Sequence, residues 1–480
     1  MENTESHPLA WRSPSPLHYQ RPFDPIEKYE YYMVTLNPSL PQRAVVVGVT
    51  FSSSTSVSIQ SLKSAWRCLR YAHPILGCDI TPAGFDFRMQ SPSQIDEWVD
   101  STFKILNDDE KGVEEQVEAI ENRKKKTIKQ ISANCPCPKT AECYYSPSTN
   151  SLFFQLRHEL TDGIGSFMLI NNFLTHLLSS QSSSPQTIET LQTENPTLLS
   201  PSMSEIAKTT EASDQLIARI NLIVKKYLSS TPIGLPLKPT LTDFESTRQD
   251  HTFTTSQTTS LLSACKSHNI TITTAFTASI GLTILKLTGA QSGDFTTSLP
   301  TSLRDTFPAP YNTAAHAALF AVTSPMPVMP ITTSTPFVSL ANTVKAAYND
   351  WKEDKENIIS HTPQGKIFQQ FVEAGVIAQN SFSGKATVVL SSLGIVEKYL
   401  TVAADSQKDG QEMGEGRIGI DDFWVGQVQG NTKIILFLYT FRSKLRLAAC
   451  YNRRFHEDEF VKQFTSTLID GVYTGLGISR

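Results

Sequence analysis

The sequence predicts a mixed α/β fold that is divided into two domains of similar make-up. Strand-like alternation and helix-like spacing of apolar residues occur in both halves of the chain. The length of 480 residues is long for a single hydrophobic core. Residues 179–204 are rich in Ser, Thr and Pro, which is typical of a linker. We therefore expect an N-terminal domain over 1–204, ending in this linker, and a C-terminal domain over 205–480.

In the first half, the sequence predicts a surface segment followed by alternating strands and helices. Residues 1–25 are Pro-rich and are expected to meander over the surface. Apolar patterns then predict a strand over 44–51, a helix over 57–72, a strand over 75–80 and a helix over 112–134. The last helix carries the basic run 123–126. We expect this run to be a solvated helix surface, with a contact to cofactor phosphates as the alternative.

The second half is expected to begin with a helix over 205–228 and a crossover segment over 229–250, which is Pro-rich in its middle. Apolar patterns then predict strands over 251–255, 386–390, 433–441 and 444–451, and helices over 256–267, 272–288, 337–352, 366–374 and 458–472. A tight turn at Arg442 and Ser443 separates the last two strands, which predicts a hairpin.

The composition argues against several classes of partner. Lys and Arg number 42, Asp and Glu number 46, and the formal charge is −4. This balance gives no electrostatic reason to expect a nucleic acid or an anionic membrane. The seven cysteines lack the regular spacing of a secreted disulfide framework. Cys135, Cys137 and Cys143 raise a zinc-site alternative, but their spacing and the lack of a fourth nearby ligand argue against it. We expect no metal.

The sequence also predicts a cytoplasmic protein. Its first residues lack the basic segment and apolar run of a signal peptide. No stretch reaches the about 18 consecutive apolar residues of a membrane-spanning helix. The nearest, 272–287, is interrupted by threonines and is expected to be a buried helix. We therefore expect no membrane insertion.

The clearest functional signal lies in residues 151–178. Leu152, Phe154 and Leu156 alternate as in a strand, and apolar residues recur at helical spacing from Ile164 onward. The polar turn 158–163, with the sequence HELTDG, joins the two patterns. A side chain at such a junction is presented by rigid elements rather than by a floppy loop.

The residue types in this turn fit proton-transfer chemistry. His158 is the side chain best suited to accept a proton near neutral pH. Asp162 could fix the tautomer of that imidazole, or it could pair with an arginine and leave the histidine free. Gly163 has no Cβ, so the chain can turn sharply and a substrate can approach the backbone. The structural alternative is a half-buried core histidine followed by an N-cap aspartate.

The stretch RHELTDGIGSFMLINNF, residues 157–173, resembles the H-x-x-x-D-G motif of the CoA-dependent acyltransferase superfamily. This superfamily includes plant BAHD acyltransferases, fungal trichothecene-type O-acetyltransferases, carnitine and chloramphenicol acetyltransferases, and the condensation domains of nonribosomal peptide synthetases. Further stretches resemble its other segments in the same order: WRCLRYAHPIL (66–76), SLPTSLRDTF (298–307), SSLGIVEKYL (391–400), DDFWVGQ (421–427) and LRLAACYNRRFHEDEFVKQF (445–464).

The resemblance implies two similar chloramphenicol-acetyltransferase-like domains, each a mixed sheet flanked by helices, with the active-site channel between them. Among the branches, the fungal secondary-metabolite acetyltransferases are the most similar. Condensation domains usually carry two adjacent histidines, and Arg157 stands where the first would be. This departure argues against peptide-bond formation rather than against acyl transfer. Residues 422–426, DFWVG, lack the inner glycine of the D-F-G-W-G segment of plant enzymes.

The resemblance also implies roles for the residues that match its motifs. His158 would act as general base on a substrate hydroxyl that attacks the thioester of acetyl-CoA, which is a co-substrate rather than a bound cofactor. Asp162 and Gly163 would support the site, with Asp162 paired to an arginine of the second domain, for which Arg304 is the candidate. The sequence identifies neither the donor that stabilises the oxyanion nor the residues that bind CoA.

The function expected from this resemblance is O-acyl transfer, with acetyl-CoA and a small hydrophobic alcohol, such as a terpenoid or polyketide, as substrates. One alternative is a stand-alone condensation-type acyltransferase that takes its acyl group from a carrier protein. Another is a repurposed scaffold that binds a hydrophobic ligand without acyl transfer. A two-domain monomer is sufficient for a site between domains. Neither the alcohol nor the acyl-chain length has a local sequence signature.

Overall fold

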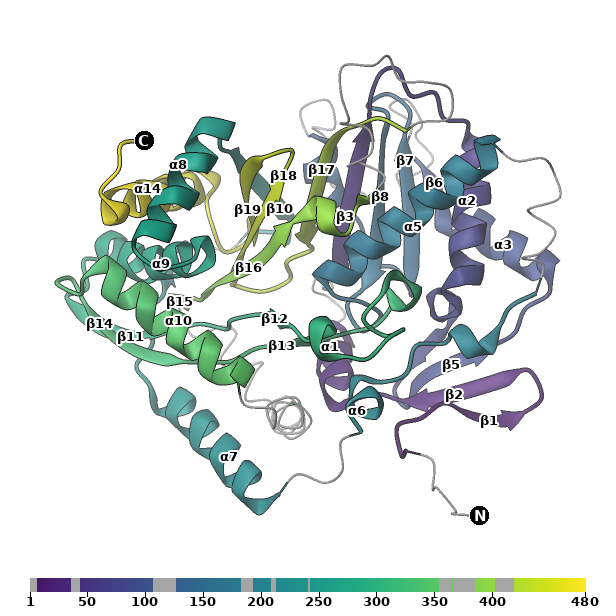
Figure 1. Cartoon of the computed structure of the whole chain (residues 1–480), viewed down its shortest axis with the longest axis horizontal. Coiled ribbons are helices and arrows are strands. Elements are labelled where there is room, and N and C mark those ends of the chain that lie inside the picture. The colour runs from purple at the N-terminus through teal and green to yellow at the C-terminus, as the bar shows by residue number, and fades with distance from the viewer. Residues whose placement is uncertain are drawn as a thin grey trace.

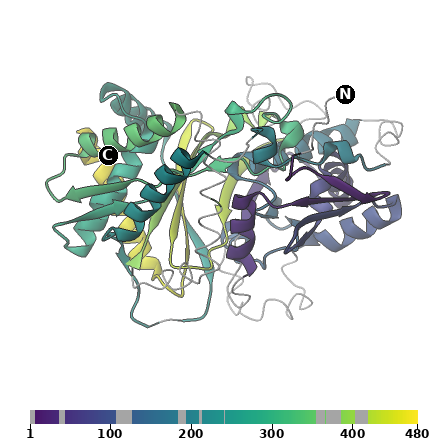
Figure 2. The same cartoon turned by 90° about the horizontal axis from the view of Figure 1, so that it is seen from below.

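The computed structural model describes residues 7–35, 44–106, 127–182, 193–208, 213–240, 242–353, 365, 385–401 and 418–480. These residues form a mixed α/β fold in two layered halves, each with a sheet covered by helices, which confirms the predicted fold class (Figure 1). Figure 2 shows the halves side by side. The predicted helix over 366–374 and the basic run 123–126 lie outside the described residues.

The first half is organised by a five-stranded sheet with the order β17-β3-β8-β7-β6. Its strands are β3 (Ala44–Phe51), β6 (Phe103–Ile105), β7 (Ala141–Ser146), β8 (Ser151–Arg157) and β17 (Ile420–Gln427). Neighbours are antiparallel except for β6 and β7. β8 is buried along its whole length because the alternating residues of its two faces meet different hydrophobic clusters.

Helices α2 (Ile59–Ala72), α3 (Pro92–Thr102) and α5 (Gly163–Ser182) belong to the same half, and α5 packs beside α2 (Figure 1). Trp66 of α2 is fully buried, stacks on Trp98 with ring centroids 5.2 Å apart, and lies 5.0 Å from the Phe154 ring. The strand that precedes the polar turn and the helix that follows it are therefore fixed in one core.

A second, smaller sheet in this half was not predicted. It has the order β1-β2-β5-β4, with β1 (Arg12–Ser15), β2 (His18–Pro22), β4 (Asp79–Thr81) and β5 (Gly84–Arg88), and helix α1 (Pro25–Thr35) follows β2. Two expectations were therefore wrong. Part of 1–25 forms strands, because its prolines fall at strand ends or on an edge strand, where no ladder bond is lost. The strand expected over 75–80 is the 3₁₀ turn η1 (Pro74–Gly77) followed by β4.

The second half is organised by a four-stranded sheet with the order β10-β19-β18-β16. Its strands are β10 (Ser246–Thr252), β16 (Val388–Ile395), β18 (Ile434–Phe441) and β19 (Lys444–Asn452). Its helices are α8 (Thr255–Ser267), α9 (Ile272–Thr288), α10 (Phe337–Glu353) and α14 (Asp458–Leu476). The β18–β19 hairpin turns at Arg442 and Ser443, whose φ values of 51° and 57° are those of a type I′ turn.

Shorter elements complete the described structure. They are α4 (Ile128–Ser132), α6 (Met203–Ile206), α7 (Asp214–Ser229), η6 (Pro196–Leu198), η7 (Arg304–Thr306), η8 (Ala314–His316) and η9 (Val396–Lys398). Three two-stranded pairs join β9 (Leu235–Pro236) to β15 (Lys385–Ala386), β11 (Ser292–Thr296) to β14 (Val328–Thr332), and β12 (Thr301–Ser302) to β13 (Val322–Thr323).

Several predicted boundaries differ from the observed ones. The helix expected from residue 205 begins at Asp214, because α6 ends before Lys208, which has a positive φ of 52°. α5 continues to Ser182, past the expected start of the linker at 179. The strand expected over 251–255 ends at Thr252, because Thr254 is the N-cap of α8 and forms a capping box with Gln257. Of the helix expected over 112–134, the described part is α4.

The two halves share structure at their junction. β17 lies between β16 and β18 of the second half in sequence but pairs with β3 of the first sheet. The two faces of β18 contact different clusters: Ile434, Leu436 and Leu438 face the helices of the second half, whereas Ile435 and Phe437 join the core of the first. The domain division at residue 204 stays a prediction, and residues 420–427 lie with the first sheet.

In the described part of the chain, no single helix is long and apolar enough to cross a membrane. α8 and α9 reach that length and apolarity only when taken together, and the pair is bent by 90°.

Candidate active site

The polar turn 158–163 lies between the end of β8 and the start of α5, as predicted. Arg157, the last residue of β8, forms a buried ion pair with Glu159. Its Cα partner across the ladder is Ala44, which belongs to the cluster on the sheet face away from α5. Arg157, which stands where condensation domains carry their first histidine, therefore lies on the sheet face opposite α5.

His158 is anchored through one ring nitrogen. Its Nδ1 lies 3.0 Å from the backbone carbonyl oxygen of Thr161. A carbonyl can only accept a hydrogen bond, so Nδ1 carries the proton and Nε2 carries the lone pair in the neutral ring. The side chain is half-buried, and its ring centroid lies 5.4 Å from that of Phe320. The turn therefore presents an oriented imidazole in the tautomer that a general base needs.

Asp162 is fully buried, and its carboxylate accepts three hydrogen bonds. Oδ1 accepts from the backbone N–H of Gly165 at 2.8 Å, which caps α5. Oδ2 accepts from the backbone N–H of Ala321 at 2.9 Å and from Arg304 Nη2 at 3.1 Å. Asp162 is therefore both the N-cap of α5 and the partner of Arg304. The imidazole of His158 is held by a backbone carbonyl rather than by this carboxylate.

Arg304 is also buried, at 2% exposure. It is the first residue of η7, two residues after the end of β12. Besides Asp162, it donates to the carbonyl oxygens of His316 at 3.1 Å, Ala317 at 3.2 Å and Leu319 at 2.5 Å. One guanidinium therefore fixes both the aspartate of the turn and the loop that carries the aromatic neighbour of the imidazole.

Gly163 begins α5 and borders the cavity described below. A Cβ added there would meet one side chain, Leu393, at 2.8 Å from its Cδ2. Its φ is not in the left-handed region. The approach of a substrate to the backbone at Gly163 stays a prediction.

Gly165 is the glycine of this turn that has no space for a side chain. A Cβ there would lie 2.2 Å from Thr161 Oγ1, 2.4 Å from the Ala317 carbonyl oxygen and 2.5 Å from Arg304 Nη2. All three atoms belong to the network around Asp162. No sequence pattern marks the crowding at Gly165, because the contact comes from a loop about 150 residues away, at Ala317.

We expect Gly165→Ala to destabilise the protein by about 1–3 kcal/mol, because the added methyl group must displace backbone and a buried guanidinium. Urea unfolding of the variant measures this loss. Gly163→Ala is the matched control in the same helical turn, where only the tip of a leucine must move. A loss for Gly165→Ala that is no larger than the loss for Gly163→Ala would contradict the close packing.

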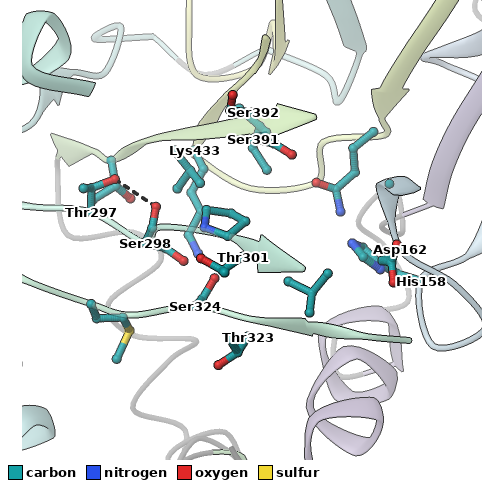
Figure 3. Close-up of a pocket in the computed structure, with 18 of the residues that line it drawn as sticks. His158, Asp162, Thr297, Ser298, Thr301, Thr323, Ser324, Ser391, Ser392 and Lys433 are labelled. Atoms are coloured by element: carbon teal, nitrogen blue, oxygen red, sulfur yellow. Dashed lines mark hydrogen bonds between the residues drawn. The ribbon is translucent and has the colours of Figure 1, made fainter. Parts of the chain in front are cut away.

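A cavity of 870 Å³ opens beside His158. Both halves line it: His158, Gly163 and Gln427 come from the first sheet and its turn, and the second half contributes residues of α7, β12, β13 and β16 and of the segments beside them. Figure 3 shows His158 and Asp162 on one side and Thr297, Ser298, Thr301 and Ser324 across from them. A volume of this size accommodates a drug-sized molecule or a cofactor arm.

The lining of the cavity mixes apolar and polar side chains. Phe320 lies beside the imidazole and Leu393 beside Gly163, and both are apolar. The lining also includes hydroxyl groups, from Ser298, Thr301, Ser302, Thr323, Ser324, Ser391 and Ser392, the ammonium groups of Lys385 and Lys433, and further apolar side chains such as Ile233 and Val389. The cavity can therefore hold both apolar and polar parts of a ligand.

Burial keeps three titratable side chains near the turn neutral: His73, His316 and Tyr399. Burial, with a smaller effect from His176, lowers the pKa of His73 to about 3. Burial and the nearby Arg304 lower the pKa of His316. Burial raises the pKa of Tyr399, a cavity-lining phenol. His73 and His316 are therefore uncharged near neutral pH, and Tyr399 keeps its hydroxyl proton.

The described residues contain no group of three or more His, Cys, Asp or Glu side chains arranged to hold a metal ion. Cys135, Cys137 and Cys143, the origin of the zinc alternative, form no disulfide within the described part of the chain, and burial raises the pKa of Cys137 to about 12. A protonated thiol is a poor zinc ligand.

Comparisons with known proteins agree with this architecture. No protein-family model matches the chain. O-acetyltransferase pigM of Monascus ruber is 26% identical over 477 residues, covering 95% of this chain and 85% of the relative. Acetyltransferase pigO of the same organism is 21% identical over 483 residues, covering 98% and 99%. The azaphilone biosynthesis cluster protein M of Aspergillus terreus is 26% identical over 333 residues, covering 67% and 76%.

Solved structures share the fold. The TRI3 trichothecene 15-O-acetyltransferase from Fusarium sporotrichioides matches with a TM-score of 0.77 at 15% identity, over 98% of both chains. The EpoB cyclization-docking bidomain of a nonribosomal peptide synthetase from Sorangium cellulosum matches with a TM-score of 0.59 at 13% identity, over 98% of this chain and 88% of that one.

The chain is thus similar over nearly its whole length to fungal acetyltransferases, and it shares the fold of a trichothecene acetyltransferase and of a cyclization domain of a nonribosomal peptide synthetase. It is an acyltransferase related to fungal secondary-metabolite acetyltransferases, as the sequence motifs predict.

Proposed function

We propose that this protein transfers an acetyl group from acetyl-CoA to a hydroxyl group of an apolar secondary metabolite, a polyketide or a terpenoid. The observation that carries the proposal is the state of His158. Its Nδ1–H is bonded to the Thr161 carbonyl, so its basic nitrogen is available at a cavity that both halves line. The names of the relatives, O-acetyltransferase and azaphilone biosynthesis cluster protein, support the same reaction and the same class of acceptor.

The proposed reaction is direct transfer with His158 as general base. Its Nε2 takes the proton of the acceptor hydroxyl as that oxygen attacks the thioester carbonyl. The tetrahedral intermediate then expels the CoA thiolate, which receives the proton from the imidazolium. Asp162 and Arg304 act as supporting residues: they hold the turn and the loop of Phe320 in place and take no proton.

The mixed lining supports two substrate positions. The apolar side chains beside His158 suit the hydrocarbon framework of the acceptor, and the hydroxyl groups with Lys385 and Lys433 suit the amides and phosphates of CoA. The first half supplies His158 and the second half supplies these hydroxyl and ammonium groups, so one chain is sufficient for activity. We propose a cytoplasmic monomer with domains over 1–204 and 205–480.

Incubation of the purified protein with labelled acetyl-CoA and a panel of polyketide and terpenoid alcohols tests this function. Mass spectrometry should detect an acetyl ester and free CoA in equal amounts. Transfer that occurs only from an acyl carrier protein would replace the proposal with condensation-type chemistry. Tight binding of the alcohols without any ester, with either donor, would identify a ligand-binding scaffold.

A further inference from the structure

Gln427, the last residue of β17, is placed beside the catalytic turn by the register of the first sheet. It pairs with Val45 of β3, and Val45 pairs with Leu156 of β8. Paired residues point to the same face of a sheet, as do residues two apart on one strand. Gln427 therefore lies on the same face as Leu156, two strand spacings or about 10 Å across, and His158 follows Leu156 by two residues, directly after the end of β8. Val45, Gln427 and His158 all line the cavity.

The side-chain amide of Gln427 is buried and held in one orientation. Its exposure is 4%, and its Oε1 accepts a hydrogen bond from Gln429 Nε2 at 3.2 Å. Gln429 is itself fixed, because its backbone N–H donates to Ser246 Oγ at 2.8 Å and its carbonyl accepts from Asn452 Nδ2 at 2.7 Å. With the oxygen occupied, the amide nitrogen is turned away from Gln429.

That nitrogen has no hydrogen-bond partner among the described residues. Buried polar groups in native proteins are nearly always bonded, so a buried N–H pair without a partner calls for an explanation. Irregular strand pairing does not explain the missing partner, because β17 pairs regularly with β3 around Gln427. A donor held in a cavity wall is, by contrast, what an anion formed during a reaction requires.

We propose that the Gln427 amide is the hydrogen-bond donor that stabilises the oxyanion of the acyl-transfer intermediate. This inference rests on the proposed function, because the anion forms only when a hydroxyl oxygen attacks a thioester. In that step the new O–C bond forms, the hydroxyl proton passes to His158, and the carbonyl π electrons move to the carbonyl oxygen. Gln427 Nε2 bonds that oxygen more strongly as an anion than as a neutral carbonyl. When the intermediate collapses, the C–S bond breaks and the leaving thiolate takes the proton from the His158 imidazolium.

Several other side chains of the cavity are already engaged within the protein. Ser392 Oγ is bonded to Thr273 Oγ1 at 2.7 Å. The hydroxyl of Thr297 donates to the Val388 carbonyl at 3.1 Å, and that of Thr301 donates to the Leu299 carbonyl at 3.0 Å. The two threonine hydroxyls would have to break a bond to serve an anion, whereas the Gln427 nitrogen would not.

Two substitutions test the proposal. Gln427→Met preserves length and removes the donor, and Gln427→Glu preserves shape while placing a carboxylate where the anion forms. Loss of one oxyanion donor lowers kcat by about 10²–10³-fold. We expect that loss in Gln427→Met and at least as large a loss in Gln427→Glu. The KM values for acetyl-CoA and for the alcohol should stay within about threefold of wild type, because this bond contributes far less to ground-state binding than to the stability of the anion.

Gln155→Met is the matched control. Gln155 is a fully buried glutamine of the same sheet, paired with Val46 on the opposite face, where it donates to the Ser132 carbonyl at 3.0 Å. Its kcat per folded molecule should equal that of wild type, which separates damage to the sheet from loss of the donor. Thermal melting of all three variants gives the folded fraction.

The outcomes separate this inference from the proposed function. A folded Gln427→Met or Gln427→Glu protein with wild-type kcat, or with a raised KM alone, would overturn the role of Gln427 while acetyl transfer by wild type still stood. If the wild-type protein itself forms no ester with any alcohol, that result overturns the proposed function. A drop in kcat with unchanged KM in both variants, and not in Gln155→Met, supports the assignment.

Discussion

Replacing His158 by alanine is expected to lower kcat for acetyl transfer by about 10²–10⁴-fold, the usual contribution of a positioned general base. The ring makes one hydrogen bond, to the Thr161 carbonyl, so its removal should leave the fold intact. Steady-state assays with labelled acetyl-CoA measure the loss. Added imidazole should restore part of the activity, because the truncated side chain leaves a space at the cavity for an external base.

The control for this variant is His268→Ala. His268 is exposed, follows α8 and lies away from the cavity lining. Its removal should leave kcat unchanged. Wild-type turnover by the His158→Ala protein would show that the substrate hydroxyl loses its proton to another group. A loss that imidazole cannot restore at any concentration, in a folded protein, would favour a positioning role over proton transfer.

Replacing Arg304 by methionine should lower the free energy of unfolding by about 3–5 kcal/mol, the range for breaking a buried ion pair from one side. The side chains of Arg304 and Asp162 are 2% and 0% exposed, so the carboxylate left behind would be a buried, uncompensated charge. Activity should also fall, because the three carbonyls that Arg304 bonds belong to the loop that carries Phe320. Urea unfolding gives the stability change.

Arg480→Met provides the comparison at the surface. Arg480 pairs with Asp470, and their side chains are 44% and 52% exposed. Exposed pairs contribute about 0–1 kcal/mol, so this variant should unfold almost as wild type does. In the double variant Arg304→Met with Asp162→Asn, the loss should be smaller than the sum of the single losses. Additive losses would mean that the two side chains do not interact.

The centre of the site could be predicted because it is local. β8, the turn and α5 are contiguous in sequence, and the switch from alternation to helical spacing marks where the turn lies. The superfamily motif then singles out His158 and Asp162. The pairing with Arg304 followed from resemblance alone, since nothing in residues 298–307 indicates which distant carboxylate the arginine meets.

The rest of the site could not be predicted because distant segments build it. The anchor of the imidazole is a backbone carbonyl, which has no residue-type signature. Gly165 is crowded by Ala317, and Gln427 reaches the cavity through a strand register that only the folded sheet defines. The small sheet of β1 and β2 was missed for a related reason, since its strands are short and pair with residues 79–88. Tertiary pairing there outweighs the local composition.

The insertion of β17 beside β3 has a consequence for synthesis of the protein. Ile420 pairs with Phe51, so most of the chain must leave the ribosome before β17 can complete the first sheet. At typical elongation rates this delay lasts on the order of tens of seconds. Throughout it, one edge of β3, with the sequence AVVVGVTF, lacks its partner strand. A β-branched strand with a bare edge is a template for aggregation, so productive folding of the nascent chain depends on shielding that edge until its last-made neighbour arrives.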